Sequence, residues 1–551
     1  MTINPQRDQM QMLLGVEAFE WMRDREFLES WDSLYDECPW ATVFQSRKYV
    51  HSWYLTFNSE YAPLLVFSYD PEGKLDGLLT MTLSKAAINY PKSVKIMGAG
   101  LYDAEYQVWL ASEENEHAFI DQALGLIWGK FPKADIIFRY IPKGTLVSSF
   151  ENSKNWKKRC VIQPFRRPLM KTQSSEISNI ISPKGQYKTK FKKLGKLKGY
   201  SFRKITEQSQ FEEILPQIID QFDFRQAAMF NKSQFRESPQ KINFYLRLFK
   251  EGLLHVTVIM VHREVLASMV ALHGKKWVHL QGINTHSPIH SKLSPGMLHF
   301  YLLAERLVEE RVDTFDLTPG WDTYKEMWMT ESDTVFSLVA TRNSFFYFKK
   351  KAKKYIYDLI LKMGLRPMSV EMYWEKRKYL LKKKGLSAFV FGEFNASLKK
   401  ENAKFYIENR DSNVIGEIPF RKNSLNDLLK YDSGKSMITR WELMERAMFC
   451  LGGQCNLYTH TNRSQLLVCV QELKDNNELT RAFSYNKDSV FLELIYCHQD
   501  QLDQIGSFIL SVINRIEERK RSNKVYLIAD KRNRELCKAL ESSNFEPAVS
   551  E

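Results

Sequence analysis

The stretch Val256–Trp328 constrains the fold most, because strand and helix patterns follow one another there in a fixed order. Two apolar strands joined by a tight turn precede a third strand, expected over Trp277–Ile283. A loop then leads to Ser294-Pro295-Gly296, which begins a helix with apolar residues at helical spacing. An apolar strand over Thr314–Thr318 follows, and then a second glycine-led helix carrying Tyr324-Lys325.

This order of elements suits a phosphorylated ligand bound at a helix N-terminus. The first backbone N–H groups of a helix have no partner within the helix, and the helix dipole places positive charge there. Gly296 lets a ligand approach the backbone closely. We therefore predict an anion site at Ser294, Pro295, Gly296 and Met297, together with Lys325.

Several motifs resemble a known family, the GNAT-superfamily acetyltransferases associated with bacterial cellulose and exopolysaccharide biosynthesis. The strongest match is Ser294-Pro295-Gly296 before its helix, followed by Phe315-Asp316-Leu317. Weaker matches lie in the first half: the run Phe44–Ser46 with Tyr49 and Trp53, and Gly98–Gly100 with Asp103 and Tyr106. The resemblance covers roughly residues 25–345, and the family is distantly related to Fem-type aminoacyltransferases.

The resemblance implies an α/β fold of tandem GNAT-like domains, with mixed sheets flanked by helices. It also implies acetyl-CoA or another acyl-CoA as co-substrate. With it we expect four regions: 1–165, an N-terminal GNAT-like domain; 166–345, the GNAT domain that binds acyl-CoA; 346–386, a basic amphipathic helical connector; and 387–551, a C-terminal degenerate GNAT-like domain. In the last region, the segment 498–506 lacks the usual glycines and carries two acids, which disfavour pyrophosphate.

Composition bounds the class of protein. At 551 residues and 44% hydrophobic content the chain can form several cores. No run of eighteen apolar residues is present, and the first residues lack a signal-peptide pattern. The seven cysteines show no zinc-type pairing. We therefore expect a cytoplasmic protein with reduced thiols and no metal.

The net charge of +14 is concentrated in two segments. The segment from Lys349 to Lys384 contains thirteen Lys and Arg residues and three acidic residues, a local net charge of +10. Its first half is amphipathic, which fits either a helix packed on the protein with its lysines in water or a helix lying on an anionic membrane. The run from Lys184 to Lys204 holds nine basic residues and no acid. It is either a solvated face or an attractor for the phosphates of a nucleotide-linked substrate or of the coenzyme. For the segment from Lys349 to Lys384, a nucleic-acid partner is the least favoured interpretation.

The chemistry expected of the second domain is direct acyl transfer, because 166–345 contains no cysteine and the chain has no G-x-S-x-G elbow. The catalytic candidates are Tyr324, Asp316 and His279. Tyr324 matches the position of the tyrosine that protonates the thiolate in GNAT enzymes, or packs with neighbouring tryptophans. Asp316 and His279 are either a base and its partner or structural groups in the sheet.

The acceptor side is predicted from the first half. The glycine-rich loop after Met97 brings Asp103, Glu105 and Tyr106 to a strand end, and Arg225 is added from a helix of the second domain. The predicted function is an acyl-CoA-dependent N- or O-acyltransferase acting on an amino sugar or another polysaccharide or cell-envelope precursor. Peripheral contact with the inner membrane or with polysaccharide-synthesis machinery is kept open. The alternatives are a Fem-type aminoacyltransferase that uses charged tRNA and a non-catalytic scaffold of a polysaccharide synthase.

Overall fold

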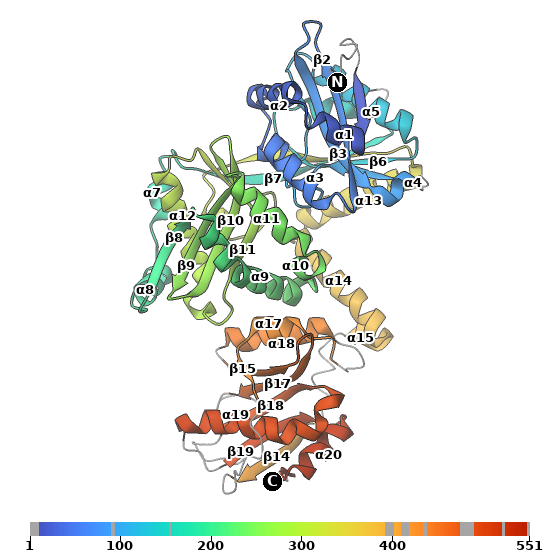
Figure 1. The fold of residues 1–551 in the computed structure, drawn as a ribbon. Helices are drawn as coiled ribbons and strands as arrows, with labels where there is room; N and C mark the ends of the chain where they lie inside the picture. The colour runs from blue at the N-terminus through green and yellow to red at the C-terminus, as the bar shows by residue number, and fades with distance from the viewer. Residues whose placement is uncertain are drawn as a thin grey trace.

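The structure is a computed structural model that describes residues 10–89, 94–153, 156–391, 402–408, 418–432, 438–453, 455–473, 490–520 and 524–547. The described residues form two β-sheets, one of thirteen strands and one of seven, each flanked by helices (Figure 1). This architecture confirms the predicted α/β class.

The first part of the large sheet is built from residues 10–141. Its strands lie in the order β1-β2-β3-β4-β6, and β5 pairs with β3. Their bounds are β1 Gln11–Leu14, β2 Tyr61–Tyr69, β3 Leu75–Ser84, β4 Lys95–Gly98, β5 Leu110–Ala111 and β6 Asp135–Ile141. The helices α2 Arg25–Glu37, α3 Arg47–Phe57 and α5 Glu116–Lys130 supply buried aromatic side chains to one large core. The helix α1 Val16–Trp21 adds the buried Ala18 and two partly buried aromatic rings.

The second part of the large sheet continues in the order β7-β12-β11-β10-β9-β8. The strands are β7 Cys160–Lys171, β8 Tyr200–Ile205, β9 Leu254–Val261, β10 Glu264–Gly274, β11 Trp277–His286 and β12 Thr314–Asp316. Helices α9 Gln208–Phe230 and α11 Gln240–Lys250 pack into the same core as the first half. Helices α7 Ile177–Ile181, α8 Gln186–Gly195 and α12 Pro295–Glu309 form separate clusters with β9–β12.

Two long strands join the two parts into one sheet. The strand β13, Glu331–Ala340, pairs with β7 along its whole length and with β6 on its other side. Residues that follow the second α/β pattern therefore complete the sheet of the first. The expected boundary at residue 165 falls within β7.

The basic connector forms two helices, α13 Ser344–Lys362 and α14 Pro367–Lys384. A short helix, α15 Leu386–Phe391, follows them. Among the described residues, no helix is both long and apolar enough to cross a bilayer.

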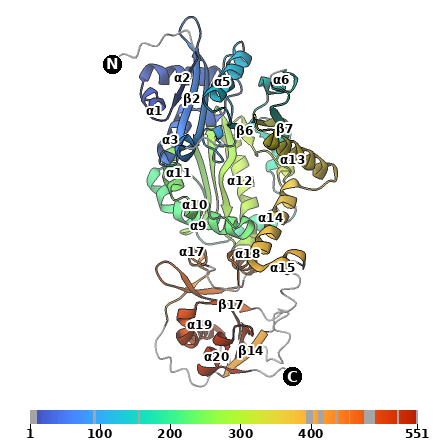
Figure 2. The ribbon, with the colours of Figure 1, turned by 90° about the vertical axis from the view of Figure 1, so that its right-hand side faces the viewer.

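The C-terminal module has its own sheet, in the order β15-β16-β17-β18-β19-β14-β20. Its elements are β14 Asn402–Glu408, β15 Arg421–Lys422, α17 Leu425–Leu429, α18 Arg440–Gly452, β16 Leu457–Thr461, β17 Leu466–Leu473, β18 Val490–Cys497, α19 Ile505–Lys520, β19 Lys524–Asp530, α20 Arg534–Ser542 and β20 Glu546–Pro547. Both views show α17 and α18 next to α9 (Figures 1 and 2). Trp441 anchors this contact: its indole N–H donates to the carbonyl of Ala228 at 2.9 Å.

Most expected elements are present, and one is wrong. In place of a helix carrying Tyr324 and Lys325, the chain forms a loop with a single 3₁₀ turn, Lys325–Met327. The ammonium of Lys325 explains this shape, because it binds the carbonyl oxygens of Thr318 and Pro319, 3.1 and 3.4 Å away. The side chain thus closes a compact loop instead of lying on a regular helix.

Candidate active site

The candidate site begins where two parallel strands separate. β11 pairs with β12 only from Trp277 to His279, and β12 then ends at Asp316 while β11 continues to His286. On its other side β11 carries a bulge against β10 between His279 and Gly282. A Cβ at Gly282 would lie 2.0 Å from the carbonyl oxygen of Val270, so only glycine fits there.

A histidine and an aspartate meet at the last paired position of these strands. Nδ1 of His279 lies 2.9 Å from Oδ2 of Asp316, and both side chains are at most 1% exposed. The other oxygen, Oδ1, accepts the backbone N–H of Thr318 at 2.8 Å. Nε2 of His279 has no hydrogen-bond partner among the described residues. Asp316 therefore fixes the ring and leaves Nε2 available to a ligand.

A buried arginine supports this pair. One terminal nitrogen of Arg167 lies 3.9 Å from Asp316, and Nε and the other terminal nitrogen bind Asp333 at 2.7 and 2.5 Å. Burial alone would raise the pKa of Asp316, but the hydrogen bond with His279 and the charge of Arg167 outweigh it and lower the pKa. Asp316 is thus held as a carboxylate. Arg167 and Asp333 were not predicted as site residues.

Aromatic rings surround the imidazole. Trp277 stacks on His279 with ring centroids 6.0 Å apart, and Phe44 and Tyr106 contact it at 5.5 and 5.7 Å. Phe44 and Tyr106 come from the first half of the chain. The first half of the chain therefore helps to enclose His279 of the second domain.

A cavity of about 520 Å³ opens onto this cluster. His279, Arg167 and Trp277 form one wall, together with Lys171 and Asp333. The facing wall comes from the first half, with the segments 39–42 and 142–144. A volume of this size is typical of small-molecule sites, and its place between two halves is a common one.

The predicted acceptor residues divide into two groups. The hydroxyl of Tyr106 is buried without a hydrogen-bond partner in the described chain, and burial with Asp316 nearby raises its pKa. Glu105 lies 3.6 Å from Arg139, and burial raises the pKa of its carboxyl against that charge. Asp103 is drawn away, because Nζ of Lys241 binds it at 2.6 Å. Tyr106 and Glu105 therefore adjoin the His279–Asp316 pair, whereas Asp103 joins the loop to α11.

The start of α12 lies at the far end of β11. Ser294 adopts the left-handed conformation (φ 50°), and its hydroxyl accepts a hydrogen bond from Nζ of Lys190, 2.6 Å away, instead of capping the helix. A Cβ at Gly296 would lie 3.0 Å from Nδ1 of His286, so the absence of a side chain makes room for this ring. The first turn of α12 is thus bordered by a lysine from α8 and by a histidine from β11.

Two further predicted residues, Arg225 and Tyr324, lie near the start of α12, together with His286. Burial, together with the charge of Arg225, lowers the pKa of His286 to about 4. Burial also raises the pKa of Tyr324, with Asp322 adding to the rise and Arg225 opposing it. The ring of Tyr324 packs edge-on against Phe300 of α12, with centroids 5.7 Å apart. Arg225, His286 and Tyr324 therefore form one neighbourhood beside Gly296.

The contacts of Lys325 differ from those of Arg225, His286 and Tyr324. Its side chain is 4% exposed, and Asp322 joins the two Thr318 and Pro319 contacts with an ion pair of 3.2 Å. All the contacts of its ammonium lie within its own loop, which suits a structural role better than the predicted phosphate contact.

Residues 183–326 match the model of a protein family described as the acetyltransferase (GNAT) domain. The match spans about a quarter of the chain and includes α8, the splayed strands and α12. This part of the protein is therefore similar to GNAT acetyltransferase domains. No curated protein sequence matches the chain.

Several solved structures are similar to this protein over about three fifths of its length at low identity. FemX is 10% identical, with a TM-score of 0.41, over 58% of this chain and 97% of that chain. L-PGS from Bacillus licheniformis is 12% identical, with a TM-score of 0.37, over 58% and 92%. A tandem GNAT protein from the clavulanic acid biosynthesis pathway is 10% identical, with a TM-score of 0.34, over 60% and 98%.

The low pKa of His286 gives a testable pH dependence. Its folded pKa of about 4 lies below the ordinary value near 6.5, so the unfolded chain takes up the proton first as the pH falls. The free energy of unfolding should therefore decrease as the pH falls from about 6.5 to about 4. This one group would contribute up to about 3 kcal/mol to the decrease. Denaturant unfolding of a His286→Gln variant should show a shallower dependence. His117→Gln, at an exposed histidine, is the control and should behave like the parent; equal slopes for all three proteins would contradict the assignment.

Proposed function

We propose that the protein is an acyl-CoA-dependent N- or O-acyltransferase whose reaction occurs at the splayed ends of β11 and β12. The observation that carries the proposal is the GNAT domain match over residues that also hold the His279–Asp316 pair. The acyl donor would enter between the separated strands, because the backbone of β11 beyond His279 has no strand partner on the β12 side.

The start of α12 is the proposed site for the donor's pyrophosphate. Pro295 has no N–H, and the N–H groups of Met297 and Leu298 donate to the carbonyl of Ser294, so the N–H of Gly296 is the one in the first turn that would face the anion. The helix dipole favours negative charge at the same place. Lys190 supplies a cation 2.6 Å from the hydroxyl of Ser294. Gly296 and Met297 lie in the same first turn, and Arg225 is a second cation beside it.

The chemistry is direct transfer. A nucleophilic amine or hydroxyl attacks the thioester carbonyl, so that a C–N or C–O bond forms and the C–S bond breaks. We propose that Nε2 of His279 takes the proton of the nucleophile, with Asp316 stabilising the imidazolium that results. Tyr324 is the proposed donor of the proton to the departing thiolate. Its raised pKa means that the phenol carries its proton at neutral pH.

The acceptor is proposed to occupy the cavity between the two halves. His279 lines this cavity, and the indoles of Trp40 and Trp277 line it as well. Flat aromatic surfaces next to charged groups suit a sugar ring that carries an amine or a hydroxyl. The resemblance to polysaccharide-associated acetyltransferases supports an amino sugar or a cell-envelope glycan precursor as the acceptor, and acetyl as the acyl group.

A second candidate is aminoacyl transfer from charged tRNA. It is compatible with the exposed lysines of α8, including Lys188, Lys192 and Lys193, which lie on the helix that supplies Lys190. Such a surface suits a polyanion as well as a coenzyme. Binding of acetyl-CoA that charged tRNA does not displace would favour the first candidate.

The donor site is tested by reversing one charge. Lys190→Glu places a carboxylate at the proposed pyrophosphate site, so we expect the Kd for acetyl-CoA to rise roughly tenfold or more, the scale of a lost charged hydrogen bond. Lys188→Glu makes the same change on the exposed face of α8 and should change the Kd only about twofold to threefold. Isothermal titration gives both values. Equal affinities for Lys190→Glu and the parent would refute the location.

The proton transfers are tested kinetically. Loss of a general base or acid costs on the order of 10²–10⁴-fold in rate, so His279→Gln and Tyr324→Phe should each lower kcat by this factor. Acetyl-CoA affinity should stay near the parent value, because these groups act in the transition state. Tyr301→Phe removes a hydroxyl from α12, the helix against which Tyr324 packs, and serves as the control. It should leave kcat near the parent value. An unchanged kcat for Tyr324→Phe would assign it to packing, as the alternative holds.

A further inference from the structure

The helix α13 presents an apolar stripe to solvent. At about 100° per residue, seven apolar side chains fall within an arc of about 100°. Six of them are large and exposed, by 45% to 78%: Phe345, Phe348, Tyr355, Ile356, Leu359 and Met363. The seventh is Ala352, also exposed. Soluble proteins rarely leave so continuous an apolar surface bare, and such patches mark interaction sites.

Lysines border this stripe on both sides. By the same helical geometry, Lys349 and Lys353 follow one edge, and Lys351 and Lys362 follow the other. All four are exposed. An apolar stripe between two rows of cations is the pattern of a helix that lies in the interface of an anionic membrane, with its apolar face among the acyl chains and its lysines at the headgroups.

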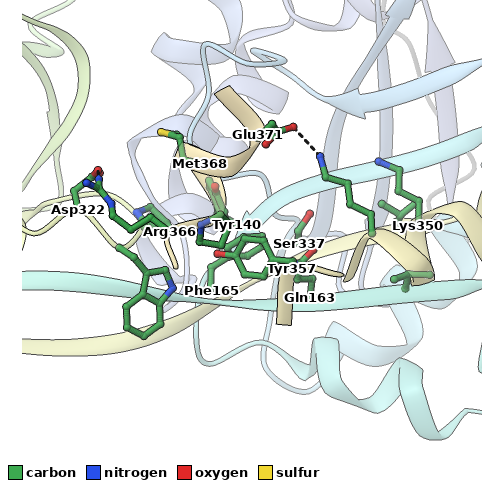
Figure 3. A pocket seen from close by; sticks show the side chains of 17 residues that line it. Tyr140, Gln163, Phe165, Asp322, Ser337, Lys350, Tyr357, Arg366, Met368 and Glu371 are labelled. Carbon is green, nitrogen blue, oxygen red and sulfur yellow. Dashed lines mark hydrogen bonds and ion pairs between the residues drawn. The ribbon is translucent and has the colours of Figure 1, made fainter. Parts of the chain in front are cut away.

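The opposite face of α13 is fixed to the protein. Tyr357 packs edge-on against Phe165 of β7, with ring centroids 5.3 Å apart. Beneath the helix lies a cavity of about 340 Å³, whose floor comes from β6, β7 and β13 (Figure 3). Across this cavity Lys353 binds Glu371 of α14 at 3.1 Å, and Arg366 binds Asp322. These contacts hold the helix so that its apolar stripe faces outward.

The C-terminal module leaves the stripe uncovered. It contacts the end of α14 instead, where Lys376 binds Glu445 at 2.6 Å and Tyr379 packs against Trp441. Figure 2 shows α13 at the edge of the molecule, away from α17 and α18. The six large apolar side chains of the stripe are exposed by 45% to 78% with the C-terminal module in place.

We propose that α13 docks the protein on the surface of an anionic phospholipid membrane, lying in the plane of the interface. Its 19 residues would extend about 28 Å along the surface. The apolar stripe supplies insertion, and the bordering lysines supply selectivity for negative headgroups. Each half of this signal is weak alone, and together they give reversible docking. The inference is independent of the acyl-transfer chemistry and stands or falls without it.

The test is co-sedimentation of the full chain with vesicles of phosphatidylcholine alone or of phosphatidylcholine mixed with phosphatidylglycerol. Binding is expected for the mixed vesicles and should weaken as salt is raised. The double variant Phe345→Ser/Phe348→Ser should reduce partitioning about tenfold or more, since two aromatic anchors no longer insert. Lys349→Gln/Lys351→Gln should abolish the preference for phosphatidylglycerol. All replaced side chains are exposed, so thermal unfolding should match the parent.

Phe449→Ser is the matched control, because Phe449 is 83% exposed on α18, remote from the stripe. It should bind vesicles like the parent. The proposal is overturned if the parent binds neither vesicle, or if the phenylalanine pair can be replaced without loss. It is also overturned if the pair instead controls self-association in light scattering, or if tRNA but not phosphatidylglycerol binds the lysine face.

Discussion

The antiparallel pairing of β7 with β13 holds the candidate site together. These strands pair from Cys160–Ala340 to Leu169–Glu331, and β13 also pairs with β6. The sheet of the first half is thereby hydrogen-bonded to that of the second. Arg167 of β7 and Asp333 of β13 are directly opposite each other in this pairing, and they form the ion pair that supports Asp316. The pairing that joins the halves therefore also positions Arg167, whose charge helps to keep Asp316 ionised.

This continuity explains why the site is shared between the halves. The imidazole of His279 is contacted by Phe44 and Tyr106 from the first half and by Trp277 from its own strand. A rigid sheet keeps these groups in register, which an interface between independent domains would do less well. The cavity at the seam then has one wall from each half of the chain, and the wall from the second half carries His279.

The sequence predicted most elements, because their apolar periodicity was strong. The strands expected over Trp277–Ile283 and Thr314–Thr318 appear as β11, Trp277–His286, and β12, Thr314–Asp316. β7 was missed because it contains Pro164 and Pro168, which argue against a strand. Both prolines are tolerated because β7 has no strand on its other side until Leu169.

Prediction of the site was limited by long-range contacts. Tyr106, Glu105, His279 and Asp316 do gather, but the pair Arg167–Asp333 is 166 residues apart in sequence and carried no local motif. The room left by Gly296 is used by His286, which no spacing could indicate. Lys325 stands in a motif, yet its ammonium is taken by its own loop.

The central claim is that the acyl-CoA donor binds the second domain at the start of α12. The proposed site consists of the loop 287–294, which joins β11 to α12, and the first turn of that helix. Hydrogen–deuterium exchange of the full chain with and without acetyl-CoA tests it most directly. We predict slower exchange confined to this loop, the end of β11 and the start of α12. Protection in the C-terminal module around residues 498–506, or no protection anywhere, would contradict the account.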